Sequence, residues 1–167
     1  MANACIGLGA NLGHPEVAVR AAIQALDALP DSRVLAASRL YRTPAWGRID
    51  QPDFINAAVL LRTALAPQAL LAHLLAIEHE AGRRRDDEAE SMRWGPRLLD
   101  LDLLLYGDQV IDEPRLRVPH PHLHERAFAL VPLAEIAPDA PFPGYRTVAA
   151  ALGLLDAASL DAMLVEG

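Results

Sequence analysis

The order of the expected segments places this chain in the α+β class, with a ferredoxin-like βαββαβ core, an additional β-hairpin and C-terminal helices. Two observations support this prediction. Short apolar runs typical of buried strands occur at residues 4–9, 34–41 and 54–61 and again after residue 97. Apolar residues recur at helical spacing over residues 15–29 and 66–82, so the order is strand, helix, strand, strand, helix, strand.

Length and composition describe one globular unit, and we expect a single domain over residues 1–167. The chain is 52% hydrophobic and 22% charged, which is ordinary for a globular protein with a substantial core. Its net charge of −7 argues against a nucleic-acid partner, because nucleic-acid binding depends on a basic surface.

The cysteine content and the apolar pattern bear on location. Cys5 is the single cysteine, which excludes an internal disulfide. No signal-peptide pattern is visible, and no apolar run approaches the ~20 residues that span a bilayer. We therefore expect a cytoplasmic monomer that binds no membrane.

The first strand is expected at residues 4–9, with Cys5 in the core, and a turn at residues 10–13. The glycines and Asn11 offer a cradle for phosphate, but the Lys and Ser/Thr of a Walker loop are missing. We favour an ordinary strand-to-helix turn. The helix over residues 15–29 begins at Pro15 and stops before Pro30, as the positional preferences of proline predict.

The second and third strands are expected at residues 34–41 and 54–61. The connection between them is far longer than a hairpin requires, and such loops usually carry function. Trp46 in this loop has no obvious core to join, which favours contact with a ligand. Phe54 and Asn56 are two residues apart and therefore share one face of a strand. Phe54 alone would suit a core position, whereas a buried Asn56 needs hydrogen-bond partners.

The second helix, residues 66–82, has Pro67 at its start and Gly82 at its end. Arginines at 83–85 and an acidic run at 86–90 follow it. This segment is nearly charge-balanced and therefore not a nucleic-acid arm, and we interpret its acidic half as solvated and flexible.

Two carboxylates interrupt the apolar strand that follows residue 97. Side chains alternate along a strand, so Asp100 and Asp102 point to one side with stems about 6.6 Å apart. This spacing leaves room for two cations, and carboxylate oxygens without nearby thiols favour Mg²⁺. The alternative is a pair of solvent-facing acids on a half-exposed strand. Because Asp is a poor strand former and Arg93 and Arg97 lie just upstream, we prefer a metal–phosphate site.

Residues 106–111 are expected to form a turn and a short strand that make the extra hairpin. His120, His122 and His124 alternate in the next segment, which suggests a zinc site. The neighbouring Pro119 and Pro121 weaken this hypothesis, because they impose their own backbone angles. A helix at 127–137, a loop at 138–143 and short helices at 147–155 and 160–165 complete the chain.

The sequence resembles a known enzyme family at these motifs. The run Arg-Trp-Gly-Pro-Arg-Leu-Leu-Asp-Leu-Asp-Leu at residues 93–103 is similar to the signature of 6-hydroxymethyl-dihydropterin pyrophosphokinases. Similar motifs are Thr43-Pro44, residues 50–53, residues 54–58 and residues 118–120. The resemblance extends from the first strand to Phe142.

This resemblance implies a folate-pathway enzyme that transfers a pyrophosphoryl group from ATP, its co-substrate, to a pterin alcohol and releases AMP. It implies two Mg²⁺ ions held by Asp100 and Asp102, and loops around Trp46 and Trp94 that close over the site and exclude water. Phe54 would stack on the pterin and Asn56 would hydrogen-bond to it, which suits a flat heteroaromatic ring with a polar edge.

The resemblance also implies the complete set of site residues. The pterin would contact Thr43, Pro44, Trp46, Phe54, Asn56, Trp94 and Phe128. ATP would contact Glu78, Arg83, Arg85, Trp94, Arg97, Leu103, Arg115, His120 and Arg126. The catalytic residues would be Arg83, Arg85, Arg97, Asp100 and Asp102, with the two aspartates as metal ligands.

Three features depart from the family pattern. Pro121 replaces an expected aromatic residue, Arg117 replaces a small hydroxyl residue, and the acidic run at 86–90 is an insertion. Two other hypotheses stay open at this stage. A zinc-binding protein would contain stoichiometric zinc, and a ferredoxin-like binding module without activity would release no AMP from ATP.

Overall fold

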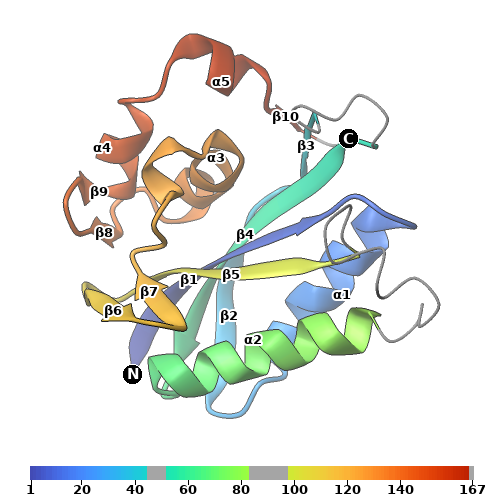
Figure 1. Cartoon of the computed structure of the whole chain (residues 1–167), viewed down its shortest axis with the longest axis vertical. Helices are drawn as coiled ribbons and strands as arrows, with labels where there is room; N and C mark the ends of the chain where they lie inside the picture. Colours follow the sequence, from blue (N-terminus) through green and yellow to red (C-terminus); the bar gives the residue numbers. More distant parts are fainter. Residues whose placement is uncertain (45–51, 83–97, 166–167) are drawn as a thin grey trace.

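A central antiparallel sheet organises the molecule. The computed structural model describes residues 1–44, 52–82 and 98–165 (Figure 1). The two long strands are β1 (Ala2–Ala10) and β4 (Phe54–Thr63), which pair along their whole length. The strand order is β10-β3-β4-β1-β5, and β2 also pairs with β4. The remaining strands of this sheet are β2 (Ser32–Ala37), β3 (Tyr41–Thr43), β5 (Asp100–Tyr106) and β10 (Leu164–Val165).

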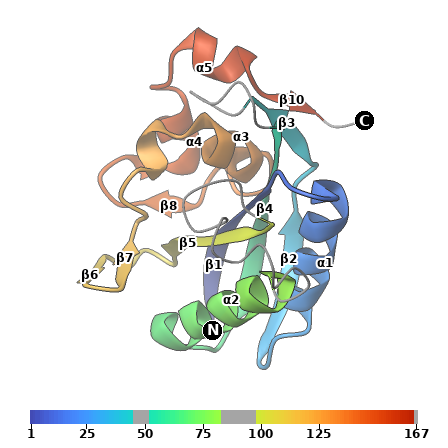
Figure 2. The same cartoon turned by 45° about the vertical axis from the view of Figure 1, so that its right-hand side comes forward.

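Two helices cover one face of the sheet. These are α1 (Pro15–Asp27) and α2 (Pro67–Gly82), which lie together beside the strands in both views (Figures 1 and 2). Ile6 and Leu8 of β1 pack in a buried cluster with Leu26 of α1 and Leu74 of α2. Leu101 of β5 joins the same cluster, so alternate residues of the strands supply this core.

The opposite face is covered by the C-terminal third of the chain, which Figure 2 shows on the other side of the sheet from α1 and α2. The helix α3 (Ala127–Ile136) packs its Leu130 and Leu133 against Cys5, Ala58 and Leu104 of the sheet. Cys5 is 2% exposed, and burial raises its pKa to about 12, as expected for a core thiol.

Short elements complete the described part of the chain. They are the hairpin β6 (Ile111–Glu113) and β7 (Leu116–Val118), a 3₁₀ turn (Leu123–Glu125), the pair β8 (Pro141–Phe142) and β9 (Arg146–Thr147), and the helices α4 (Val148–Leu152) and α5 (Ala157–Asp161). In the described ranges, no helix is both long enough and apolar enough to cross a bilayer.

The predicted α+β class is confirmed, and so are the additional hairpin and the positions of both long helices. The single strand expected at residues 34–41 is wrong, because β2 and β3 are separate. Between them the Ser38 hydroxyl accepts a hydrogen bond from the Ala58 N–H at 2.9 Å and donates one to the Arg39 carbonyl at 2.7 Å. The side chain thus replaces a ladder hydrogen bond and interrupts the strand.

Two expectations for the C-terminal region are also wrong. The helix expected at 160–165 is replaced by α5, which starts earlier because Asp156 caps it by accepting from the Ser159 N–H at 2.8 Å. Leu164 and Val165 instead form β10, since the backbone of β3 offers them a pairing partner. The loop expected at 138–143 contains β8, which pairs with β9.

Candidate active site

The two carboxylates of β5 lie in register with polar and small residues of the neighbouring strands. Asp100 is opposite Gly9 of β1, and Gly9 is opposite Asn56 of β4. Asp102 is likewise opposite Gly7, which is opposite Ala58. Directly opposed residues of antiparallel strands point to the same face, so the amide and both acids share the face that α3 covers in part.

A cavity of about 330 Å³ opens above these residues. Its lining combines the two acids with five other residues that the sequence singled out: Thr43, Phe54, Asn56, Arg126 and Phe128. Its other described lining residues are Gly7, Leu8, Gly9, Ala57, Leu104 and Ala129. We call it the first cavity.

Asn56 is held in a fixed orientation at one side of the first cavity. Its side-chain Nδ2 donates to Oγ1 of Thr43 at 2.8 Å, and the residue is 5% exposed. Pairing of β3 with β4 sets this contact, because Tyr41 is opposite Asn56 and Thr43 is opposite Phe54. A buried amide that is oriented in this way is prepared to recognise one polar edge of a ligand.

Two aromatic residues come to the first cavity from different elements. Phe54 begins β4, and Phe128 lies in the first turn of α3. Phe128 is 37% exposed, and the guanidinium of Arg126 lies 5.5 Å from its ring centre. An exposed ring beside a cavity is well placed to stack on a flat ligand.

A second cavity of about 370 Å³ lies along β5 and shares both Asp100 and Asp102 with the first. Among its lining residues are four that the sequence singled out for ATP: Glu78, Leu103, Arg115 and His120. It is also lined by Leu71 and Leu75, which the sequence did not single out, and by Arg117 and Pro121, two positions at which the chain departs from the family pattern. Asp100 and Asp102 therefore line both cavities, whose other lining residues differ: Phe54, Asn56 and Phe128 in the first, and Arg115 and His120 in the second.

The side chain of Glu78, on α2, is hydrogen-bonded to the backbone at the start of β5. Its Oε2 accepts a hydrogen bond from the Leu101 N–H at 2.7 Å. The pKa of Glu78 is raised to about 7, chiefly by burial; the charges of Asp100 and Asp102 add to the rise, and the hydrogen bond from the Leu101 N–H opposes it. The Glu78 carboxyl group therefore lies close to Asp100 and Asp102, and the three acids together favour the binding of a cation.

His120 is placed by its backbone. Its N–H donates to the Leu104 carbonyl at 3.0 Å, which ties the segment after β7 to β5. Partial burial lowers the pKa of His120, and the nearby charge of Arg126 lowers it further. A neutral imidazole is thus favoured at the rim of the second cavity.

The helix that carries Arg126 and Phe128 at its start is clamped to the sheet near its other end. Glu135 accepts hydrogen bonds from the Arg39 N–H at 2.9 Å, from Arg39 Nε at 3.1 Å and from the Tyr41 hydroxyl. Burial alone would raise the pKa of Glu135, but the hydrogen bonds from Tyr41 and Arg39 outweigh it and the pKa is lowered. This clamp fixes α3 over β3.

We expect Glu135→Gln to lower the thermal unfolding midpoint at pH 7 by about 2–4 °C, because two of its donors then face a weaker acceptor. A lowered carboxyl pKa stabilises the fold above the unfolded pKa of about 4.3 and loses that effect as pH falls. The difference between the two proteins should therefore shrink below about pH 4. Differential scanning calorimetry at pH 7 and pH 3.5 measures both effects.

Glu113→Gln is the matched control, because Glu113 is exposed and bonds to the neutral Gln68 at 3.1 Å. It should shift the midpoint less than Glu135→Gln. Equal shifts for the two variants, or a difference that persists in acid, would contradict the clamp.

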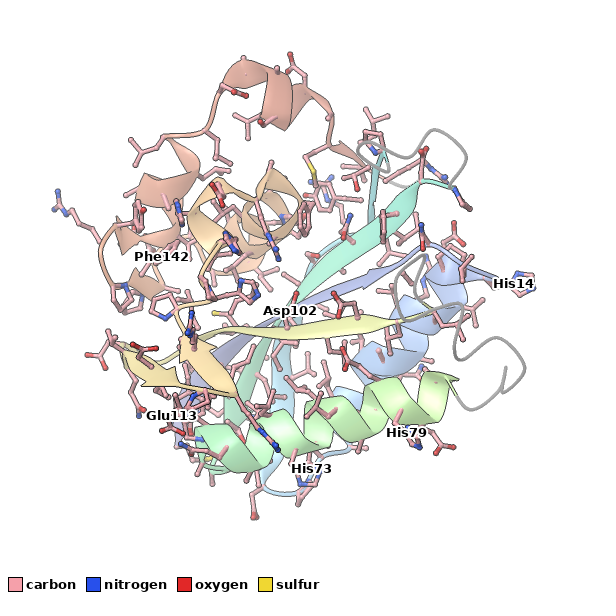
Figure 3. All side chains as sticks on the ribbon, in the orientation of Figure 1. His14, His73, His79, Asp102, Glu113 and Phe142 are labelled. Carbon is pink, nitrogen blue, oxygen red and sulfur yellow. The ribbon has the colours of Figure 1, made fainter. Side chains whose placement is uncertain are left out.

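The histidines do not form the zinc site that their spacing suggested. His122 Nδ1 pairs with Glu125 Oε1 at 2.8 Å, while the His124 ring stacks on Tyr145 with centres 5.3 Å apart. Among the described residues, no group of three or more His, Cys, Asp or Glu side chains is arranged to hold a metal ion. Figure 3 shows His14, His73 and His79 at the periphery, far from Asp102.

Among the described residues, Asp100 and Asp102 form a pair of carboxylates that no third metal-ligating side chain completes, and such a pair suits one class of metal. Mg²⁺ is usually held by one or two carboxylates, with phosphate oxygens of the substrate and water completing its octahedron. The chemistry of Asp100 and Asp102 fits this pattern and does not fit structural zinc, which takes four protein ligands.

Five of the expected site residues fall in the two ranges between the described parts of the chain. Trp46, Arg83, Arg85, Trp94 and Arg97 lie outside the described residues, and so do both loops expected to close. Pro44 is exposed directly after β3 and is not among the residues that line the first cavity.

Gly7 and Gly9 are among the residues of the first cavity to which the sequence assigned no role. Their alternation within an apolar strand was the available signal, because glycine in a strand interior often marks a close approach of another group.

A larger cavity of about 540 Å³ lies on the other face of the sheet, between α1 and α2. It is lined mainly by alanine and other apolar side chains. Among the described residues, its lining includes neither the acid pair nor an arginine.

Comparisons with known proteins agree with this geometry. A family model described as 7,8-dihydro-6-hydroxymethylpterin-pyrophosphokinase matches residues 5–138. The 2-amino-4-hydroxy-6-hydroxymethyldihydropteridine pyrophosphokinase of Pseudomonas aeruginosa is 50% identical over 141 residues, which are 84% of each chain. The protein of the same name from Methylorubrum extorquens is 48% identical over 162 residues, which are 96% of this chain and 98% of that one.

Solved structures extend the comparison to the fold. The chain superposes on a crystal structure of HPPK-DHPS in complex with substrates with a TM-score of 0.70 at 13% identity. The match covers 91% of this chain but 43% of that one, so this chain spans less than half the length of the solved protein. The family model and the two relatives at 48–50% identity establish that the chain belongs to the 7,8-dihydro-6-hydroxymethylpterin-pyrophosphokinase family.

Proposed function

We propose that this chain transfers the pyrophosphoryl group of ATP to 6-hydroxymethyl-7,8-dihydropterin, which gives the pterin diphosphate and AMP, at the two carboxylates shared by its two cavities. Pyrophosphate transfer to hydroxymethyldihydropterin is the reaction of the family and a step of folate biosynthesis. The observation that carries the proposal is that Asp100 and Asp102 line both cavities. Two substrates that meet at the acids can react there without leaving their own sites.

The first cavity suits the pterin. Asn56 and Asp100 stand on strands separated by β1, and two strand spacings amount to about 9.6 Å. A fused two-ring heterocycle with a hydroxymethyl group is of comparable length, so its polar edge reaches Asn56 while its hydroxyl reaches the acids. Phe54 and Phe128 supply ring faces for stacking.

The second cavity suits ATP. Leu71, Leu75 and Leu103 offer apolar contact for a nucleobase, while Arg115 and His120 offer hydrogen bonds to ribose and phosphate oxygens. Arg126 lines the first cavity next to the acids, where it faces the end of a polyphosphate chain. Arg83, Arg85 and Arg97 are proposed to add the remaining positive charge, with Trp94 beside them. Trp46 and Pro44 are proposed to complete the pterin contacts.

Asp100 and Asp102 are the proposed ligands of Mg²⁺. When bound, Mg²⁺ supplies charge neutralisation at the phosphates and polarises the phosphorus that is attacked. The protein side chains then do the positioning before bonds change: Asn56 would orient the ring, and Asp100 and Asp102 would hold the Mg²⁺ to which the phosphates bind. For phosphoryl transfer, positioning and electrostatics account for most of the catalysis.

Several finer features are proposed on the same basis. The strand order β5-β1-β4-β2, antiparallel throughout, supports a ferredoxin-like core, since it is the arrangement expected for βαββαβ connectivity. A single domain over residues 1–167, two bound Mg²⁺ ions, a monomeric state and a cytoplasmic location stay predictions from the sequence.

The experiment that tests the function follows the products. ATP, Mg²⁺ and hydroxymethyldihydropterin are incubated with the protein, and nucleotides are separated by ion-exchange chromatography. AMP should form together with pterin diphosphate, and omission of either Mg²⁺ or the pterin should abolish it. Formation of ADP would indicate transfer of a single phosphoryl group, and AMP formed without pterin would indicate hydrolysis; either result contradicts the proposal.

A further inference from the structure

We infer that Arg117 allows the second cavity to accept guanine as well as adenine, so that GTP serves beside ATP as a donor of the pyrophosphoryl group. The inference rests on the proposed function, since it takes the second cavity to hold the nucleotide. Arg117 stands where the family pattern has a small hydroxyl residue, so the inference concerns a property of this chain in particular.

The reaction with GTP has the same chemistry as the reaction with ATP. The hydroxymethyl oxygen of the pterin bonds to the β-phosphorus, and the bond from that phosphorus to the α-phosphate oxygen breaks. The hydroxyl proton passes to solvent, and GMP leaves in place of AMP. The donor base takes no part in these bond changes, so its identity is decided by binding alone.

The second cavity has two ends, and Arg117 lies at the end away from the acid pair. Near the C-terminus of α2, Glu78 bonds to the Leu101 N–H, next to the acids. Near the start of the same helix, Gln68 donates to Glu113 of the β6–β7 hairpin at 3.1 Å. Ten residues of helix separate these two contacts, which amounts to about 15 Å along the axis. A nucleotide whose phosphates lie at the acids therefore extends its base toward the hairpin that carries Arg117.

The wall of the second cavity suits a base with one polar edge. Its apolar lining consists of Leu71, Leu75, Leu103 and Leu116. Arg117 lines the same cavity with 62% of its side chain exposed, so its guanidinium is accessible to a ligand. A flat base that packs on the leucines meets Arg117 with its polar edge.

Asp112 holds one side of the Arg117 guanidinium. The two residues are directly opposed in the hairpin, and Nε of Arg117 lies 3.4 Å from Oδ1 of Asp112. Within the described ranges, Arg117 makes no other ion pair. The two terminal nitrogens thus remain to donate a parallel pair of hydrogen bonds, the arrangement in which arginine recognises two adjacent acceptors.

Such a pair of donors distinguishes the two purines. Guanine presents N7 and O6 as adjacent acceptors, and arginine binds them in the commonest base-specific contact of protein–DNA complexes. Adenine presents N7 beside an amino group, whose hydrogens would face the donors of arginine. A hydroxyl group both donates and accepts, so it is able to serve adenine. Arginine at position 117 therefore shifts the preference of the cavity toward guanine.

Steady-state kinetics with each nucleotide tests the inference. Formation of pterin diphosphate is followed with MgATP or MgGTP, and kcat/KM for GTP is divided by kcat/KM for ATP. This ratio should exceed about 0.1 in the parent protein, and Arg117→Thr should lower it by about 10-fold or more, the usual discrimination of one bidentate contact to a base. GMP should appear in the same amount as pterin diphosphate.

Two comparisons separate recognition of the base from a general effect of charge. Arg117→Lys keeps the charge but lacks the planar pair of donors, so it should lower the ratio nearly as much as Arg117→Thr. 7-Deaza-GTP lacks the N7 acceptor. The parent should use it about 10-fold less well than GTP, whereas Arg117→Thr should use the two nucleotides about equally.

Arg33→Thr is the matched control. Arg33 is an exposed arginine in the strand β2, and it lines neither the first nor the second cavity. This variant loses the same charge as Arg117→Thr and should keep the ratio of the parent protein.

The possible outcomes separate the inference from the proposed function. If the parent forms pterin diphosphate from neither nucleotide, the proposed function fails. If the parent is active with ATP but does not use GTP, or if Arg117→Thr or Arg117→Lys keeps the parent ratio, the inference is overturned. Should Arg117→Thr not fold, Arg117→Lys and the parent decide: a lowered ratio together with poorer use of 7-deaza-GTP supports the inference, and equal use of GTP and 7-deaza-GTP overturns it.

Discussion

Replacing Asp102 by alanine should reduce the rate of AMP formation by about 10³-fold or more, while the fold stays intact. The expected size follows from the position of this residue at the junction of both cavities. Loss of its carboxylate removes a proposed metal ligand exactly where phosphate charge must be neutralised. Stability should change little, because Asp102 lies near Asp100 and Glu78, so its removal also relieves repulsion between acids.

The measurement combines AMP release with magnesium titration and thermal unfolding. Asp102→Ala should need far more Mg²⁺ for any residual rate and should unfold within a few degrees of the parent protein. Asp108→Ala is the control, since Asp108 is an exposed acid in the turn that follows the same strand. Near-normal turnover in Asp102→Ala, or an equal loss in Asp108→Ala, would remove the metal role from this position.

The helix and the strand around Asp100 and Asp102 could be predicted from the sequence because the patterns that indicate them span only a few consecutive residues. Pro67 and Gly82 mark the ends of α2 in the structure as they do in the sequence pattern. The alternation around Asp100 and Asp102 indicated one shared face, and both residues do line the same two cavities. Periodicity and proline or glycine position are properties of a few consecutive residues, so tertiary contacts are not needed to recognise them.

The missed features depend on contacts between distant segments. Whether residues 164 and 165 form a helix or a strand is decided by the backbone of β3, more than a hundred residues earlier in the chain. The break between β2 and β3 needs the Ala58 N–H as a donor to Ser38. No local pattern in either segment reports these partners, and strand preference in particular depends on context.

The same distinction between local patterns and long-range contacts applies to the residues of the site. A single sequence places Asn56 on the same face as Phe54, and Asp100 on the same face as Asp102. It does not give the register that sets Asn56, Gly9 and Asp100 in one row, because a shift by one residue would send every side chain to the opposite face. The contribution of Gly7 and Gly9 to the first cavity was missed for that reason.

Replacing Asn56 by leucine should lower kcat/KM for the pterin by about 10²–10³-fold and leave the KM for MgATP within about 2-fold. The side chain keeps roughly its volume but loses its donor and its acceptor, so the polar edge of the bound ring stays buried without partners. The Thr43 hydroxyl, which accepts from Asn56 Nδ2 at 2.8 Å, loses its partner as well. This selective effect contrasts with Asp102→Ala, which should impair the use of both substrates.

Two further variants establish that recognition and not stability is lost. Asn3→Leu replaces an exposed asparagine of β1 that bonds to Arg62 at 3.1 Å, and it should keep the parent kinetics. Thr43→Val leaves the amide of Asn56 in place but removes the hydroxyl that orients it, so it should raise the pterin KM by about 10-fold or less. If Asn56→Leu raised the KM for MgATP as much as that for the pterin, Asn56 would be a structural residue of β4 and the first cavity would not be the site of the ring.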